Sequence, residues 1–122
     1  MLRAEPQAAT RARHAALSRA EALGAAERIR AAIAIAVTEA VANVIVHAYR
    51  DHPSGGDLEV AIRGDERTLE VEVRDRGVGL RPRDDSPGLG LGLGLMAELA
   101  DVFEISSAEP FGTRVRLCFE LS

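Results

Sequence analysis

Four glycines alternate with leucine from Gly88 to Gly94, and this run constrains the fold more than any other stretch. Each glycine inside a regular element costs roughly 0.5–1 kcal/mol relative to alanine. A small domain is stable by only roughly 5–15 kcal/mol, so four such residues are a heavy burden. We therefore expect the run to expose backbone N–H groups to a close ligand, with a purely structural turn as the alternative. Glycine-rich turns that lead into a helix bind phosphate in this way, and residues 93–100 have the pattern of such a helix.

Composition narrows the class of protein. The 122 residues suffice for one domain, which we place at 1–122, and a content of 47% hydrophobic and 28% charged residues is typical of globular proteins. A net charge of −4 and an aromatic content of 3% argue against a nucleic-acid-binding surface. All 15 basic residues are arginine, which excludes a Walker A loop, a protein-kinase nucleotide lysine and a Schiff-base enzyme. No leader pattern or membrane-spanning apolar run is visible, so we expect a cytoplasmic protein without a membrane partner.

The pattern predicts two helices, a hairpin, the glycine loop with its helix, and a final hairpin. Small apolar residues at helical spacing predict a helix over residues 7–23, ended by Gly24, and a second helix from about 26 to 49. Alternating apolar residues predict a hairpin over 58–73 and two later strands over 102–107 and 113–121. Residues 1–7 are expected to be frayed. Helices then cover one face of a mostly antiparallel sheet, which is an α+β two-layer sandwich.

The second helix carries three polar side chains on one narrow face. Glu39, Asn43 and His47 follow one another at four-residue steps, while residues such as Ile35 leave little of the helix polar, so we expect it to be largely buried. Buried polar side chains need partners. The three residues therefore form either a structural hydrogen-bond network or the wall of a pocket that holds a charged ligand. For His47 a packing or hydrogen-bonding role is favoured over a catalytic one.

Asp75, followed by a Gly-x-Gly, ends the first hairpin, and Thr113 opens the last strand. Together with the helix segment 38–49 and the glycine run, they resemble the GHKL ATPase superfamily of gyrase, Hsp90, sensor histidine kinases and MutL. Within it the chain looks most like the small anti-sigma-factor serine kinases, over about residues 26–121. The resemblance implies the Bergerat ATP-binding fold. The chain departs from the family pattern in several respects: no strand is predicted ahead of the first helix, the connector 80–87 is short for a nucleotide lid, and the lid has no lysine.

The resemblance implies a role for each motif residue. Asn43 would coordinate a Mg²⁺ ion that bridges the triphosphate, and Glu39 would be the general base or the orienting carboxylate for the attacking hydroxyl or water. Asp75 would accept a hydrogen bond from the adenine amino group of ATP, and Thr113 would support the adenine. The backbone would approach the base at Gly77 and Gly79 and the phosphates at Gly88, Gly90, Gly92 and Gly94.

The resemblance implies an ATP- and magnesium-dependent serine/threonine protein kinase. Such a kinase binds a sigma factor, phosphorylates an anti-anti-sigma partner of the STAS type and so regulates transcription by partner switching; homodimerisation is left open. Two other functions also stay open, an ATP-binding interaction module without kinase activity and a detached catalytic domain of a sensor histidine kinase. A Rossmann-type dinucleotide site is rejected, because the polar segment 84–87, and not a strand, precedes the glycine run.

Overall fold

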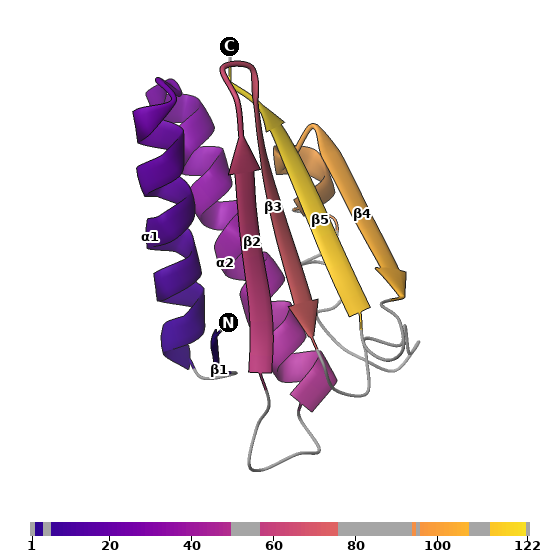
Figure 1. Cartoon of the computed structure of the whole chain (residues 1–122). Coiled ribbons are helices and arrows are strands. Elements are labelled where there is room, and N and C mark those ends of the chain that lie inside the picture. The colour runs from indigo at the N-terminus through magenta and orange to yellow at the C-terminus, as the bar shows by residue number, and fades with distance from the viewer. Residues whose placement is uncertain are drawn as a thin grey trace.

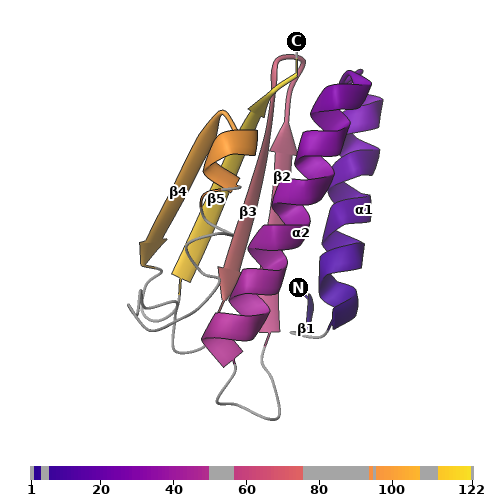
Figure 2. The ribbon, with the colours of Figure 1, turned by 180° about the vertical axis from the view of Figure 1, so that it is seen from behind.

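Helices cover one face of a five-stranded antiparallel sheet in the computed structural model, which describes residues 2–3, 6–49, 57–75, 94, 96–107 and 113–121. The strand order is β1-β2-β3-β5-β4, and each neighbouring pair runs antiparallel. Figure 1 shows the face of the sheet that carries no helix, and Figure 2 shows α1 and α2 side by side on the opposite face. The predicted α+β two-layer sandwich is confirmed. The elements are β1 (Leu2–Arg3), α1 (Pro6–Ala22), α2 (Glu27–Tyr49), β2 (Asp57–Gly64), β3 (Thr68–Asp75), β4 (Val102–Ser107) and β5 (Thr113–Glu120).

The sheet begins with a short strand that the sequence pattern did not predict. Leu2 pairs with Leu58 and Arg3 with Asp57, so β1 forms the edge of the sheet beside β2. The expectation that residues 1–7 are frayed, with no strand ahead of the first helix, is therefore wrong. Two residues are too few to show an alternating pattern, and only the partner strand makes them a strand.

The first helix ends where the sequence predicted. Gly24 has a φ of 81°, a left-handed conformation that glycine adopts without steric cost. The N–H of Ala25 donates to the carbonyl oxygen of Ala20 at 3.0 Å, and the N–H of Gly24 donates to that of Glu21 at 3.0 Å. This pair of bonds is a Schellman motif, which satisfies the last carbonyl groups of a helix. On α1, which packs mainly against α2, four alanines at four-residue steps are buried: Ala8, Ala12, Ala16 and Ala20.

The core lies between α2 and the two central strands of the sheet. The apolar side chains of α2 that the structure places there are Ile33, Val37, Val41 and Val44, and those of β3 and β5 are Leu69, Val71, Val73, Val115, Leu117 and Phe119. Ile35 departs from the expectation of a largely buried helix, because 46% of its surface is exposed. It lies two residues from Val37, about 200° around the helix, and therefore on the side turned away from the core.

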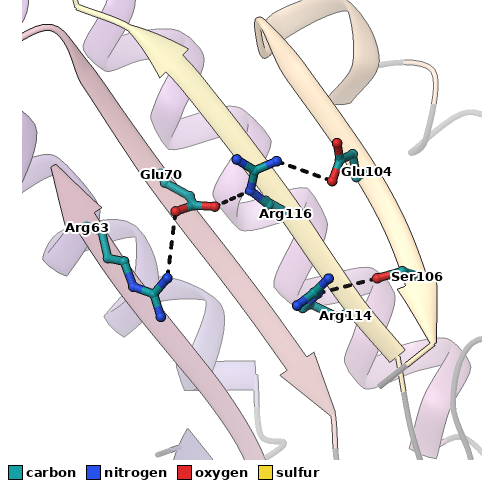
Figure 3. Close-up of polar contacts among 6 residues, drawn as sticks. All are labelled: Arg63, Glu70, Glu104, Ser106, Arg114 and Arg116. Atoms are coloured by element: carbon teal, nitrogen blue, oxygen red, sulfur yellow. Dashed lines mark hydrogen bonds and ion pairs between the residues drawn. The ribbon is translucent and has the colours of Figure 1, made fainter. Parts of the chain in front are cut away.

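Ion pairs cross the helix-free face of the sheet (Figure 3). The Nε of Arg116 donates to Oε1 of Glu70, and its Nη1 donates to Oε2 of Glu104 at 3.2 Å. Arg63 adds a longer contact to Glu70, 4.0 Å from nitrogen to oxygen. The strand register places Arg116 opposite Glu104 on β4 and Glu72 on β3, and its contact on β3 is the diagonal one to Glu70, two residues from Glu72 on the same face. Exposed pairs of this kind contribute little to stability, and this face is polar.

A side chain closes the turn between β2 and β3. Oδ1 of Asp65 accepts hydrogen bonds from the backbone N–H groups of Arg67 at 2.8 Å and Thr68 at 2.9 Å. These bonds stabilise the carboxylate and lower the pKa of Asp65 below its ordinary value of 3.8.

On β5, burial raises the pKa of the Cys118 thiol, although the neighbouring Arg116 opposes that shift.

Candidate functional site

Glu39 and Asn43 lie one turn apart in the C-terminal half of α2, and both are half-buried. The buried side chains of Val41 and Val44 fix this half of the helix on the sheet. The Nδ2 atom of Asn43 is buried and has no hydrogen-bond partner among the residues that the structure describes. A buried polar group without a partner costs about 1–3 kcal/mol. The sequence left two roles open for Asn43, a structural hydrogen-bond network or the wall of a ligand pocket. Among the described residues, its Nδ2 takes no part in such a network.

A buried carboxylate lies at the end of β3. Asp75 is the last residue of that strand and is 0% exposed. Because Arg74 pairs with Arg114, the next residues along the two strands, Asp75 and Thr113, are neighbours across β3 and β5. Figures 1 and 2 both show this end of β3 at the same end of the molecule as the C-terminal half of α2. The fold therefore brings the part of α2 that carries Glu39 and Asn43 and the end of β3 that carries Asp75 to one end of the molecule.

The glycine run is described at one position. Gly94 is helical and exposed, and among the described residues a Cβ atom added to it would meet no other atom within 4 Å. Packing therefore does not require glycine there. Met96, two residues later, is fully buried and holds this helical segment against the core. The predicted site residues outside the described part of the chain are Gly77, Gly79, Gly88, Gly90 and Gly92, together with the side chains of His47 and Thr113.

The described residues offer few metal ligands. No three His, Cys, Asp or Glu side chains gather in a group that could hold a metal ion in the ranges that the structure covers. Magnesium, however, usually keeps several waters and takes one or two protein groups in addition to substrate phosphates. The amide oxygen of Asn43 is a ligand of the required hard type, whereas its unpartnered Nδ2 is a donor that suits a phosphate oxygen. The side chains present therefore fit a magnesium ion that is held mainly by phosphates.

The sequence as a whole identifies the family. Residues 2–119 match the model of a family described as a histidine kinase-like ATPase domain. The chain belongs to this family. Membership implies ATP binding by the domain, and the expected GHKL-type ATPase is thereby confirmed. In the described ranges, no helix of this histidine kinase-like ATPase domain has the length and apolarity to cross a membrane.

Similar proteins narrow the relationship within the histidine kinase-like ATPases. The anti-sigma F factor of Heyndrickxia coagulans is 35% identical, and the match covers 66% of this chain and 63% of the relative. The anti-sigma F factor of Bacillus cytotoxicus is 34% identical, with 70% and 66% covered. The chain thus spans about two thirds of the length of the curated relatives that it matches.

A solved structure shows the same fold. The crystal structure of the RsbU and RsbW domains of Rv1364c from Mycobacterium tuberculosis matches with a TM-score of 0.75 and 26% sequence identity. The match covers 98% of this chain and 31% of that chain. The histidine kinase-like ATPase domain described here therefore has the RsbW-like Bergerat fold.

One surface feature gave no signal in the sequence. A hollow of about 420 Å³ lies between the N-terminal half of α2, the helical segment 96–99 and the end of β5. Its walls come from three stretches that are far apart in the chain. No spacing or periodicity within one stretch could have predicted it.

Proposed function

We propose that this protein is an ATP- and magnesium-dependent serine kinase of the anti-sigma-factor type. It binds a sigma factor and phosphorylates a serine of an anti-anti-sigma partner of the STAS type. Similarity to two anti-sigma F factors supports the choice of this branch of the histidine kinase-like ATPases.

One observation carries the proposal more than any other. Nδ2 of Asn43 is buried and unpartnered among the described residues, and Asn43 lies one turn from Glu39 on α2. Buried polar groups of native proteins usually have a hydrogen-bond partner, so one without a partner calls for an explanation such as a bound ligand or ion. A ligand that binds beside Glu39 supplies the reason for keeping Asn43.

Each residue then has one task. Asp75 accepts a hydrogen bond from the adenine amino group and so selects adenine over guanine, and Thr113, its neighbour across the strands, supports the base. Asn43 provides a protein ligand for Mg²⁺, which neutralises charge on the β- and γ-phosphates when it is bound. Backbone N–H groups of the glycine run, including Gly94, bind phosphate oxygens.

Glu39 acts on the acceptor serine. Its carboxylate accepts the proton of the serine hydroxyl as the oxygen attacks the γ-phosphorus. The new bond joins the serine oxygen to phosphorus, the bond between phosphorus and the β,γ-bridging oxygen breaks, and ADP leaves. The chain has no lysine, so positive charge near the γ-phosphate comes from magnesium, arginine or backbone dipoles.

A thermal-shift titration tests the nucleotide site. The melting temperature is measured with ATP, ADP and GTP, each with and without Mg²⁺. A nucleotide at a hundredfold excess over its Kd stabilises the folded state by about 2.7 kcal/mol. We expect a shift that is selective for adenine and larger with magnesium. No shift with any nucleotide would refute the site.

A phosphotransfer assay then separates the two main functions. The protein is incubated with radiolabelled ATP and a STAS-type anti-anti-sigma protein, and the phosphoserine is located by mass spectrometry. Serine phosphorylation supports the kinase. Good nucleotide affinity without any transfer would favour the alternative, an ATP-binding interaction module that sequesters its partner.

A further inference from the structure

The hollow beside α2 has an apolar floor and a charged rim. Ile29 and Ala32 of α2, Leu99 of the short helical segment and Phe119 of β5 form its apolar part. The charged groups around it are Arg28 of α2 on one side and Asp101 and Glu120 on the other. Arg28, Asp101 and Glu120 are exposed residues, and Oδ2 of Asp101 accepts a hydrogen bond of 2.6 Å from the backbone N–H of Glu120.

The hollow and Glu39 lie along the same face of α2. A helix advances 100° per residue, so Ala32 and Glu39, seven residues apart, differ by about 20° around the axis. The same seven residues separate them by about 10 Å along the helix. Ile35 lies between them and within about 60° of both, and it is 46% exposed. Ile35 therefore places one accessible apolar side chain between the hollow and the proposed catalytic carboxylate.

This spacing matches an extended polypeptide. A segment in the polyproline II conformation advances about 3.1 Å per residue with three residues per turn, so about 10 Å corresponds to three residues and returns the side chain to the same side. A serine at Glu39 would thus place a side chain three residues away in the sequence over the hollow. The intervening part of the segment would cross Ile35.

We propose that the hollow binds an apolar side chain of the phospho-acceptor, three residues from its serine, with the acceptor segment extended along α2. This inference rests on the proposed kinase function and adds a specificity rule to it. The charges around the hollow determine which residue type is favoured next to the apolar residue in the acceptor segment. Two carboxylates against one guanidinium leave the rim negative, which favours a basic residue beside the apolar one.

Synthetic peptides test the rule directly. Ten-residue fluorescent peptides contain one serine, a leucine three residues before or after it, and an arginine beside the leucine, in an alanine–glycine background. Their binding to the full chain is measured by fluorescence anisotropy with Mg²⁺ and the non-hydrolysable analogue AMP-PNP. One of the two orientations should bind about tenfold more tightly than its Leu→Ala counterpart, because a leucine side chain leaves water.

Two variants assign that preference to the hollow. Ala32→Trp fills the hollow and should abolish the leucine preference, whereas Ala15→Trp, at an exposed alanine of α1, should retain it. Glu120→Lys reverses an exposed charge of the rim, so it should weaken binding of the arginine peptide and strengthen that of a glutamate twin. This reversal decides the question even if Ala32→Trp does not fold, as judged by circular dichroism.

The outcomes distinguish this inference from the kinase proposal. No leucine preference in either orientation, or a preference that survives in folded Ala32→Trp, would overturn the docking site. Serine phosphorylation at equal rates with and without leucine would overturn it and leave the kinase standing. Leucine-dependent binding without any phosphate transfer would support the docking site and count against the kinase.

Discussion

Replacing Asn43 by leucine should stabilise the nucleotide-free protein. Leucine has a similar branched shape, and it removes a buried amide nitrogen that has no partner among the described residues. The relief of an unsatisfied buried group is worth about 1–3 kcal/mol. For a domain of this size, 1 kcal/mol corresponds to about 4 °C in melting temperature. We therefore expect Asn43→Leu to melt at least about 4 °C higher than the parent in the absence of nucleotide.

The same substitution should remove the stabilisation by ligand. The parent gains about 2.7 kcal/mol from Mg²⁺-ATP at a hundredfold excess over Kd. Asn43→Leu lacks the amide oxygen for magnesium and should gain far less. The order of stability therefore reverses when Mg²⁺-ATP is added, and chemical denaturation with and without the ligand measures both sides of this reversal.

A matched variant tests whether the gain comes from the missing partner. Oγ1 of Thr38, on the same helix, donates a hydrogen bond of 2.7 Å to the carbonyl oxygen of Ala34. Thr38→Val removes a polar group that already has a partner and should give no comparable gain. A nucleotide-free Asn43→Leu that is less stable than the parent would refute the reasoning, since it would show that the folded chain satisfies the amide of Asn43.

Four further predictions concern other residues. Glu39→Gln should slow phosphotransfer by about 10²–10⁴-fold in a single-turnover assay but keep the thermal shift with Mg²⁺-ATP. An unchanged rate would show that Glu39 is not the general base. Gly94→Ala should stabilise the free protein by about 0.5–1 kcal/mol in urea denaturation, because Gly94 is helical and no atom of the described residues lies where the added methyl group would go. It should also weaken ATP binding in calorimetry, and unchanged affinity would exclude close phosphate contact there. Asp65→Asn should lose stability at pH 7 relative to the parent, but the difference should shrink as the pH falls below 3.8. The folded-state pKa of this carboxyl lies below its unfolded value, so its contribution is complete above that value and is lost on acidification. Urea denaturation at pH 7 and pH 3 measures this, and a constant difference would contradict it. Cys118 should react slowly with iodoacetamide at pH 8, with a rate still rising above pH 9.0 in mass spectrometry, because burial raises the pKa of its thiol. A reaction rate that no longer increases above pH 8 would show that the pKa of the Cys118 thiol is not raised.

Local sequence patterns were enough to predict the longer helices and strands. Gly24 predicted the end of α1, and its φ of 81° shows why glycine is needed there. Alternation along Leu69, Val71 and Val73 predicted which face of β3 is buried. These features depend on residues within one or two turns or strands, so the chain itself carries their signal. The two-residue strand β1 had no such signal.

The candidate site shows the same division. The four-residue step between Glu39 and Asn43 is enough to predict that both residues share one face of a helix. That Asp75 is fully buried, and that Thr113 is its neighbour, follows only from the pairing of β3 with β5, two strands that are distant in the chain. The register of two distant strands is set by the global packing of the sheet.

Sequence alone determined the family, the helices and strands of more than two residues, and the residues expected to bind ATP, because short-range periodicity and motif spacing are properties of the local chain. The tertiary structure decided which groups share an environment. It exposed Ile35, left the amide of Asn43 unpartnered among the described residues, aligned Arg116 between two glutamates and enclosed the hollow beside α2. Each of these depends on the packing of segments that are distant in sequence, and such contacts are decided by the free energy of the whole fold.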